Sequence, residues 1–177
     1  MLVVQPGSGH NPVQATLEVA SLDSSPEYRT ISYAWGDATL RSTIELDKGN
    51  IDVPASTVAA LIKMRSEDEV SVLWIDAVCI NQSDIVERAQ QVQMMSQIYS
   101  RSRGNLIFLG DGDPLTASAL TSIHRVYLEL EVETNDFSQL EGTLLGTSTA
   151  PLEAPTDIAY EIDIAALKNF FSLPWFK

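Results

Sequence analysis

The stretch LWIDAVCINQ, residues 73–82, decides the predicted fold. With the preceding VSV it begins as a nearly continuous apolar run, which is typical of a strand buried on both faces of a parallel sheet. It then changes to Asp76, Cys79, Asn81 and Gln82, residue types that suit a polar site. Because ligands in open α/β sheets bind at the carboxyl ends of the strands, we expect this strand to deliver its polar residues to a binding edge.

Further strand patterns lie on both sides of this stretch. YRTISYAWGD (28–37) is rich in β-branched and aromatic residues and ends in a Gly-Asp turn, as does NLIFLGDGDP (105–114). STIELDKGNIDVP (42–54) predicts a small β-hairpin with DKGN as its turn. QATLEVA (14–20) alternates like a strand, whereas residues 1–12, rich in Gly, Pro and Ser, predict a loose start.

Helix patterns separate these strands. Ser56 is the predicted N-cap of a helix over 55–65. A longer helix is predicted over 84–101, where Asp84 and Glu87 have the spacing of a capping box. Its apolar stripe, predicted to face the core, consists of Ile85, Ala89, Val92, Met95 and Tyr99.

The alternation of strands and helices predicts a single α/β domain with a mainly parallel sheet, flanking helices and the small hairpin as an insertion. After the third strand, Pro114 begins another predicted helix, and a last amphipathic segment covers 157–173. The intervening residues 134–157, rich in Thr, Ser, Gly and Pro, predict a long loop.

Charge and composition exclude several classes of protein. The 177 residues carry 11 basic and 24 acidic side chains, a formal net charge of -13, which disfavours binding to nucleic acid or to anionic lipid. One cysteine excludes an intrachain disulfide, and two histidines offer no zinc-binding pattern, so we expect no metal and no resident cofactor. We see no membrane span or secretion signal, and the cytoplasm is the expected compartment.

The end of the first central strand supplies the aromatic candidates for a ligand site. Tyr33 and Trp35 could stack on a nucleotide base or nicotinamide, Gly36 allows close approach to the backbone, and Asp37 could accept hydrogen bonds from ribose hydroxyls. The alternative is an aromatic packing residue followed by an ordinary turn.

The polar residues after the next strand also have two interpretations. Asp76, Asn81 and Gln82 could form one wall of a ligand pocket, or they could tie down their own loop through capping and Asx-turn hydrogen bonds. Cys79 lacks any local signature of a nucleophile, so a packed thiol is favoured over a cysteine hydrolase. Arg88 opposes the helix dipole at its position, and we expect it to contact Asp76, Asp37 or a ligand phosphate.

Four blocks of sequence resemble the heterokaryon-incompatibility (HET) domain of filamentous fungi. They are YRTISYAWGD (28–37), LWIDAVCINQSDIVERAQQVQMMSQIY (73–99), NLIFLGD (105–111) and FFSLPWF (170–176), in the family's order. In the family, an Arg, a Trp and a Gln-Glu pair normally follow the last block, so we expect residues 1–177 to be a single HET domain truncated just before that motif.

The resemblance implies a function in the cell death that follows fusion of incompatible fungal cells. HET domains are similar to TIR domains, which share a flavodoxin-like order of elements, and several TIR domains hydrolyse NAD with a Glu. By this analogy the catalytic Glu belongs to the Gln-Glu pair beyond Lys177, so this chain is expected to be a weak or inactive NAD hydrolase. NAD is then a substrate rather than a cofactor.

A second hypothesis of a different class remains open. The domain would act as a signalling module, by self-association or by binding other death-signalling domains, without turning over any ligand. Substitutions at Asp37 or Arg88 would then leave signalling intact, whereas substitutions on a helix surface would abolish it.

Overall fold

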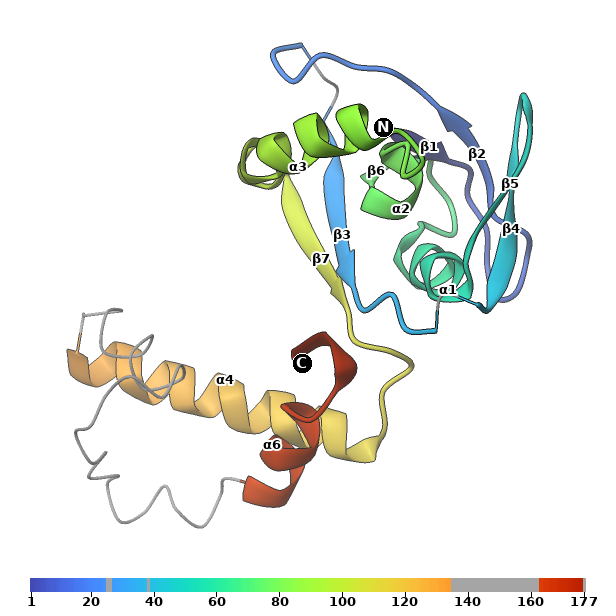
Figure 1. Ribbon diagram of the computed structural model, residues 1–177. Coiled ribbons are helices and arrows are strands. Elements are labelled where there is room, and N and C mark those ends of the chain that lie inside the picture. Colours follow the sequence, from blue (N-terminus) through green and yellow to red (C-terminus); the bar gives the residue numbers. More distant parts are fainter. Residues whose placement is uncertain (25–26, 38, 135–162, 177) are drawn as a thin grey trace. The chain divides into compact units, whose positions relative to one another are not determined.

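The structure is a computed structural model that describes residues 1–24, 27–37, 39–134 and 163–176 (Figure 1). It divides into two compact units, Met1–Gly110 and Asp111–Lys177. The first unit contains the sheet and three helices, and the second is helical. Of the helices in the described part of the chain, none combines the length and apolarity that crossing a membrane requires.

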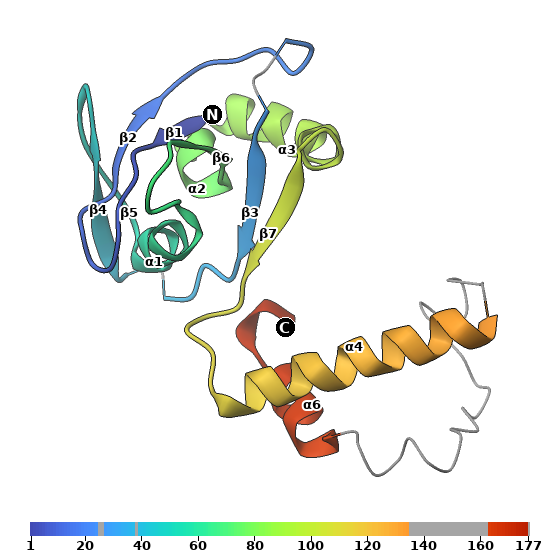
Figure 2. The ribbon, with the colours of Figure 1, turned by 180° about the vertical axis from the view of Figure 1, so that it is seen from behind.

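The first unit is built on a seven-stranded sheet in the order β5-β4-β2-β1-β6-β3-β7 (Figures 1 and 2). The strands are β1 (Leu2–Val4), β2 (Gln14–Leu17), β3 (Arg29–Tyr33), β4 (Arg41–Leu46), β5 (Gly49–Pro54), β6 (Ser71–Trp74) and β7 (Gly104–Phe108). The predicted hairpin is confirmed, since β4 and β5 pair antiparallel from Arg41 with Pro54 to Leu46 with Gly49.

The sheet is mixed, so the α/β class is confirmed but a mainly parallel sheet is not. The pairs β3-β6, β3-β7 and β2-β4 are parallel, whereas β1-β2, β1-β6 and β4-β5 are antiparallel. The physical reason is β1, which enters the middle of the sheet antiparallel to both of its neighbours. The parallel part is confined to β6, β3, β7 and the β2-β4 pair.

The prediction of a loose start over residues 1–12 is wrong for its first residues. Leu2 and Val4 are fully buried and belong to the main hydrophobic cluster. They pair with Leu17 and Ala15 of β2 on one side and with Leu73 and Ser71 of β6 on the other. Three residues are too few to show a period, and their burial depends on partners far along the chain.

Helices cover both faces of the parallel strands. Strand residues alternate between faces, and Ile31, Tyr33 and Leu73 pack in one cluster with residues of α1 (Ala55–Met64). The opposite cluster joins Tyr28 and Trp74 to Ile98 of α3 (Ile85–Ser100). A short helix that was expected to be a loop, α2 (Asp76–Cys79), follows β6.

Helix α3 begins as predicted but packs differently. Asp84 is its N-cap and accepts hydrogen bonds from the backbone N–H groups of Val86 and Glu87. The capping box does not close, because the Glu87 carboxylate accepts instead from the backbone N–H of Asn81 (3.0 Å).

The predicted core stripe of α3 is wrong at its amino-terminal end. Ile85 is 71% exposed and Val92 is 54% exposed, whereas Ile98, which lies outside the stripe, is buried. Met95 and Tyr99 pack against the opposite cluster, which contains Tyr28, Trp74 and Ile98. The pattern therefore located an apolar face, only part of which is covered in the first unit.

The second unit contains α4 (Pro114–Thr134), α6 (Ile164–Phe170) and a 3-10 turn, η1 (Pro174–Phe176). The prediction that Pro114 begins a helix is confirmed. Asp163 is the N-cap of α6 and also accepts a hydrogen bond from Ser118 of α4 (2.8 Å), so it holds the two helices together. The predicted loop over 134–157 lies outside the described residues, apart from Thr134 at the end of α4.

Candidate functional site

The loops that follow β3 and β6 meet at the carboxyl edge of the parallel strands. The Trp35 indole Nε1–H donates a hydrogen bond to Asp76 Oδ2 (3.1 Å), across 41 positions of the sequence. The Trp35 carbonyl in turn accepts from the Ser56 hydroxyl at the start of α1 (2.6 Å). The expected convergence of the two polar clusters is therefore present, and its direct link is the Trp35–Asp76 pair.

The prediction that Ser56 is the N-cap of α1 is wrong. The Ser56 side chain makes no capping hydrogen bond, and Pro54 holds the N-cap position. The hydroxyl is used instead to fix the backbone of Trp35. This residue has a positioning function that the cap pattern could not predict, because its partner lies in another loop.

Trp35 combines a fixed position with an accessible ring. Its side chain is 39% exposed even though its carbonyl and its indole nitrogen both have partners. Gly36 follows with φ of +63°, a left-handed conformation that favours glycine, and turns the chain away immediately after the ring. A tryptophan held at its indole nitrogen and its carbonyl thus remains partly accessible to a ligand.

Asp76 is the half-buried carboxylate of this edge. Its Oδ1 accepts from the backbone N–H of Ala77 (2.7 Å), and its carbonyl accepts from the Gln82 side-chain amide (2.9 Å). Burial raises the pKa of Asp76, while the hydrogen bonds from Ala77 and Trp35 oppose that rise. The negative charge of Asp76 also contributes to raising the pKa of Tyr33 and of Tyr99, which places both phenols within its electrostatic reach.

Tyr33 is buried at the end of β3 and does not form part of the accessible surface of this edge. The side chain is 8% exposed, and its hydroxyl shares a hydrogen bond with the hydroxyl of the fully buried Thr57 (2.7 Å). Burial is the main cause of the raised pKa of Tyr33, with the Thr57 hydrogen bond opposing it. Little of this ring is accessible to a ligand.

Asp37 and Asn81 are both occupied by their own turns. Asp37 Oδ1 accepts from the backbone N–H and the hydroxyl of Thr39 (2.9 and 2.7 Å), and these bonds lower the pKa of Asp37. Asn81 Oδ1 accepts in the same way from the N–H and hydroxyl of Ser83 (3.2 and 2.6 Å). The loop-tying interpretation therefore holds for these oxygens, and a network can tie a loop and still border a ligand.

Arg88 lies in the first turn of α3 and is exposed. Its guanidinium has no hydrogen-bond or ion-pair partner among the residues that the structure describes, so neither Asp76 nor Asp37 neutralises it. Of the partners expected for it, a ligand anion remains.

Cys79 is partly buried at the end of α2, and burial raises the pKa of its thiol. A raised pKa lowers the fraction of reactive thiolate, which agrees with a packed thiol. Over residues 1–24, 27–37, 39–134 and 163–176, no cluster of three His, Cys, Asp or Glu side chains is arranged to hold a metal ion.

The fold and this edge define an α/β domain whose candidate ligand site lies where parallel strands end. The sequence model of the family described as "Heterokaryon incompatibility protein (HET)" matches residues 28–177, and the chain belongs to this family. Over 126 residues it is 30% identical to heterokaryon incompatibility protein 6, OR allele, of Neurospora crassa, an alignment that covers 62% of this chain and 18% of that protein. The chain thus spans under a fifth of this relative's length. No solved structure matches the chain.

Proposed function

We propose that this HET domain binds NAD or a related nucleotide at the carboxyl edge of β3 and β6, as part of a cell-death function in fungal incompatibility. The observation that carries the proposal is the Trp35–Asp76 hydrogen bond. It joins an accessible aromatic ring, which suits a base or nicotinamide, to a carboxylate, which suits ribose hydroxyls. When the ligand binds, Asp76 accepts hydrogen bonds from the ribose hydroxyls, either in place of the bond from the Trp35 indole or in addition to it.

The strand order supports a flavodoxin-like or TIR-like character for the central part of the fold. Among β3, β6 and β7, the spatial order β6-β3-β7 is second, first, third along the chain, and the connections pass over opposite faces. In the flavodoxin-like order 2-1-3-4-5 the ligand lies at the reversal between the first and third strands. Trp35 follows the first of these strands.

The remaining candidates come from β3, from the loops after β3 and α2, and from the first turn of α3. Arg88 supplies an uncompensated cation for the diphosphate, and Asp37 and Gly36 lie in the same loop as Trp35. Asn81 and Gln82 come from the loop after α2, where the Gln82 amide donates to the Asp76 carbonyl, and the buried Tyr33 is the last residue of β3.

Cleavage of NAD is a separate step of the proposal. It passes through an oxocarbenium-like ribosyl cation, which needs a suitably placed carboxylate. The TIR analogy assigns that carboxylate to the Glu of the family's Gln-Glu pair, which is not one of the residues around Trp35. Binding and turnover should therefore be measured separately, and only binding is expected of the residues around Trp35.

The binding test uses the indole N–H signals of the three tryptophans in a ¹⁵N-labelled chain. On titration with NAD, the Trp35 signal, assigned through Trp35→Phe, should move saturably, and the signal of the buried Trp74 should move much less. Asp76→Ala should abolish the movement. Arg88→Gln should weaken NAD binding about tenfold but leave adenosine binding unchanged, because adenosine has no diphosphate.

Two results would defeat this proposal. One is a Trp35 signal that does not respond to NAD in a folded chain. The other is an equal response in Asp76→Ala, which would separate the ligand from the pair. Arg101→Gln is the matched control for Arg88→Gln, since Arg101 is an exposed arginine held by Asp23 at 2.8 Å.

A second function, self-association, is favoured by the exposed apolar part of α3. Ile85, Val86 and Val92 are 71%, 67% and 54% exposed. If this surface joins copies of the chain, Ile85→Glu should lower the sedimentation coefficient at high concentration, whereas Gln90→Glu, the same charge change at an exposed polar position of α3, should not. Unchanged sedimentation of Ile85→Glu would rule out this surface.

A further inference from the structure

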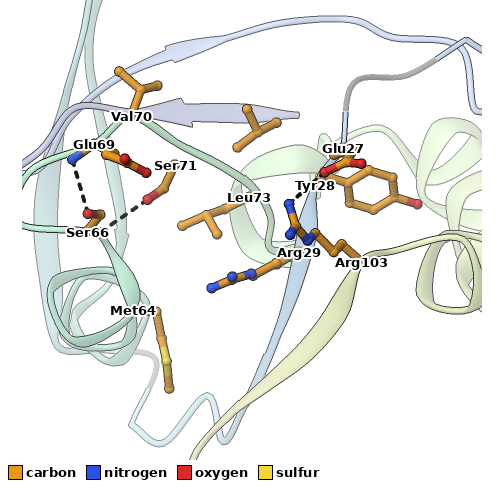
Figure 3. Close-up of a pocket in the computed structure, with 11 residues that line it drawn as sticks. Glu27, Tyr28, Arg29, Met64, Ser66, Glu69, Val70, Ser71, Leu73 and Arg103 are labelled. Carbon is orange, nitrogen blue, oxygen red and sulfur yellow. Dashed lines mark hydrogen bonds and ion pairs between the residues drawn. The ribbon is translucent and has the colours of Figure 1, made fainter.

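A polar cleft of about 350 Å³ opens at the amino ends of β3, β6 and β7, the edge opposite the Trp35–Asp76 pair (Figure 3). Its apolar lining includes Met64 from the end of α1 and Leu73 from β6. Polar side chains come from the entry to each strand. The volume is at the lower end of the range for small-molecule sites.

Arg29 is the uncompensated cation of this cleft. It is the first residue of β3, and Figure 3 shows its guanidinium extending between Leu73 and Met64. This guanidinium has no hydrogen bond or ion pair with any residue in the described part of the chain. The other arginine of the cleft, Arg103, is instead held by Glu27 at 2.7 Å.

Two serines of the cleft have hydroxyl hydrogens to donate. Ser66 Oγ accepts from the backbone N–H groups of Asp68 and Glu69 (3.2 and 3.1 Å), and Ser71 Oγ accepts from the N–H of Ser66 (3.1 Å). Neither hydroxyl donates to a described residue. Because a hydroxyl both donates and accepts, each can still bind a ligand oxygen.

The acidic residues of the cleft limit what Arg29 can attract. Glu27 is used by Arg103, but the Glu69 carboxylate has no partner among the described residues. The cleft therefore contains two arginines against two glutamates, with one free charge of each sign. A polyanion would be repelled by Glu69 and by a chain of net charge -13, whereas a ligand with one anionic and one cationic group fits both free charges.

We propose that this cleft binds a small amphoteric metabolite of the α-amino acid class. Its carboxylate contacts Arg29, with the Ser66 and Ser71 hydroxyls as additional donors, and its ammonium group contacts Glu69. The aliphatic part of the ligand lies on Met64, which is only partly buried. At roughly 30 Å³ per water molecule, the cleft holds the equivalent of about a dozen waters, which is enough for such a molecule.

The test is an NMR titration of the ¹⁵N-labelled chain with three probes: L-alanine, acetate and inorganic phosphate. L-alanine should produce saturable shifts of the amides of residues 70–72 and 103 and should bind more tightly than the other two probes. Arg29→Gln should weaken L-alanine binding about tenfold or more, since a charged hydrogen-bonding partner is lost. Glu69→Gln should weaken L-alanine binding but leave acetate binding unchanged or slightly tighter.

Arg101→Gln, which removes an exposed arginine outside the cleft, is the control and should bind L-alanine as the unaltered chain does. Arg29 and Glu69 are both exposed, so their variants should fold, as the spectra will show directly. Tighter binding of phosphate than of L-alanine would overturn the amphoteric specificity. No saturable shift with any probe, or equal L-alanine binding by Arg29→Gln, would overturn the site.

Discussion

Arg65 provides the sharpest test of how the sheet unit is held together. This arginine follows α1 and is only 6% exposed. Its Nη1 donates to the Pro12 carbonyl (2.9 Å) and its Nη2 to the Asn11 carbonyl (2.8 Å), with a longer contact to Gly9 (3.4 Å). Its Nε is buried without a partner. A charged side chain therefore anchors the segment between β1 and β2 through carbonyls alone.

Replacing Arg65 by Met or by Lys should destabilise the unit, and Lys should be the worse of the two. Each strong bond from a charged donor contributes about 1.5 kcal/mol or more, so Met loses about 3 kcal/mol and regains about 1 kcal/mol because the unpaired Nε is removed. The net loss is about 2 kcal/mol. Lys keeps a buried charge without the planar fork that reaches both carbonyls, and we expect a loss of about 3 to 4 kcal/mol.

Urea unfolding measured by tryptophan fluorescence tests this order. A Trp175→Phe background confines the signal to Trp35 and Trp74, both in the first unit. Arg88→Met, at an exposed arginine whose guanidinium has no partner among the described residues, should change the free energy of unfolding by no more than about 0.5 kcal/mol. If Arg65→Lys proves as stable as the unaltered chain, or more stable than Arg65→Met, the Arg65 guanidinium does not anchor the segment between β1 and β2.

A double-mutant cycle with Gly7 adds an independent check. A Cβ at Gly7 would lie 2.8 Å from Arg65 Cζ and Nη1. Gly7→Ala should therefore cost about 1 to 3 kcal/mol in the native background and distinctly less beside the flexible side chain of Arg65→Met. Additive effects would show that the two residues do not meet.

Three further predictions concern the candidate site and its supports. Because burial raises the pKa of Asp76, the folded state binds its proton more tightly, so stability should fall as pH rises from 3.8 through the raised value. The difference in unfolding free energy between the unaltered chain and Asp76→Asn, followed across pH by urea unfolding, should show this loss. Tyr33→Phe leaves the buried Thr57 hydroxyl unpaired and should cost about 1 to 3 kcal/mol in urea, most of which Thr57→Val should restore. Asp84→Ala removes the N-cap of α3 and should cost about 1 kcal/mol, whereas Asp84→Asn should cost little, with hydrogen exchange in the first turn as the measurement.

Local rules predicted the elements whose causes are local. The hairpin follows from a turn sequence between two alternating strands, and the α3 start follows from Asp84 bonding to N–H groups two and three residues on. The mixed sheet could not be predicted in this way. It depends on β1, a strand of three residues whose antiparallel pairing with β6 is decided by residues about seventy positions away.

The exposed part of α3 has a similar explanation. Spacing of apolar residues predicts that a helix has an apolar face but not which partner covers it. Ile98 and Met94 pack against Tyr28 and Trp74, so the helix is rotated relative to the predicted stripe and Ile85 is left exposed. The spacing of the apolar residues is compatible with more than one rotation of α3 about its axis, and packing against the sheet selects the rotation that is observed.

For the candidate site, the sequence could identify the residue types at the strand ends but not the hydrogen-bond partners of their side chains. Asp37 and Asn81 have an acceptor oxygen engaged in their own turns, and Tyr33 is paired with Thr57 in the core. Trp35 and Asp76 instead meet across two loops, a contact that no local pattern encodes. Because this hydrogen bond joins side chains from two separate loops, a ligand that contacts both of them bridges the loops, so Trp35 and Asp76 are the residues whose substitution should weaken binding most.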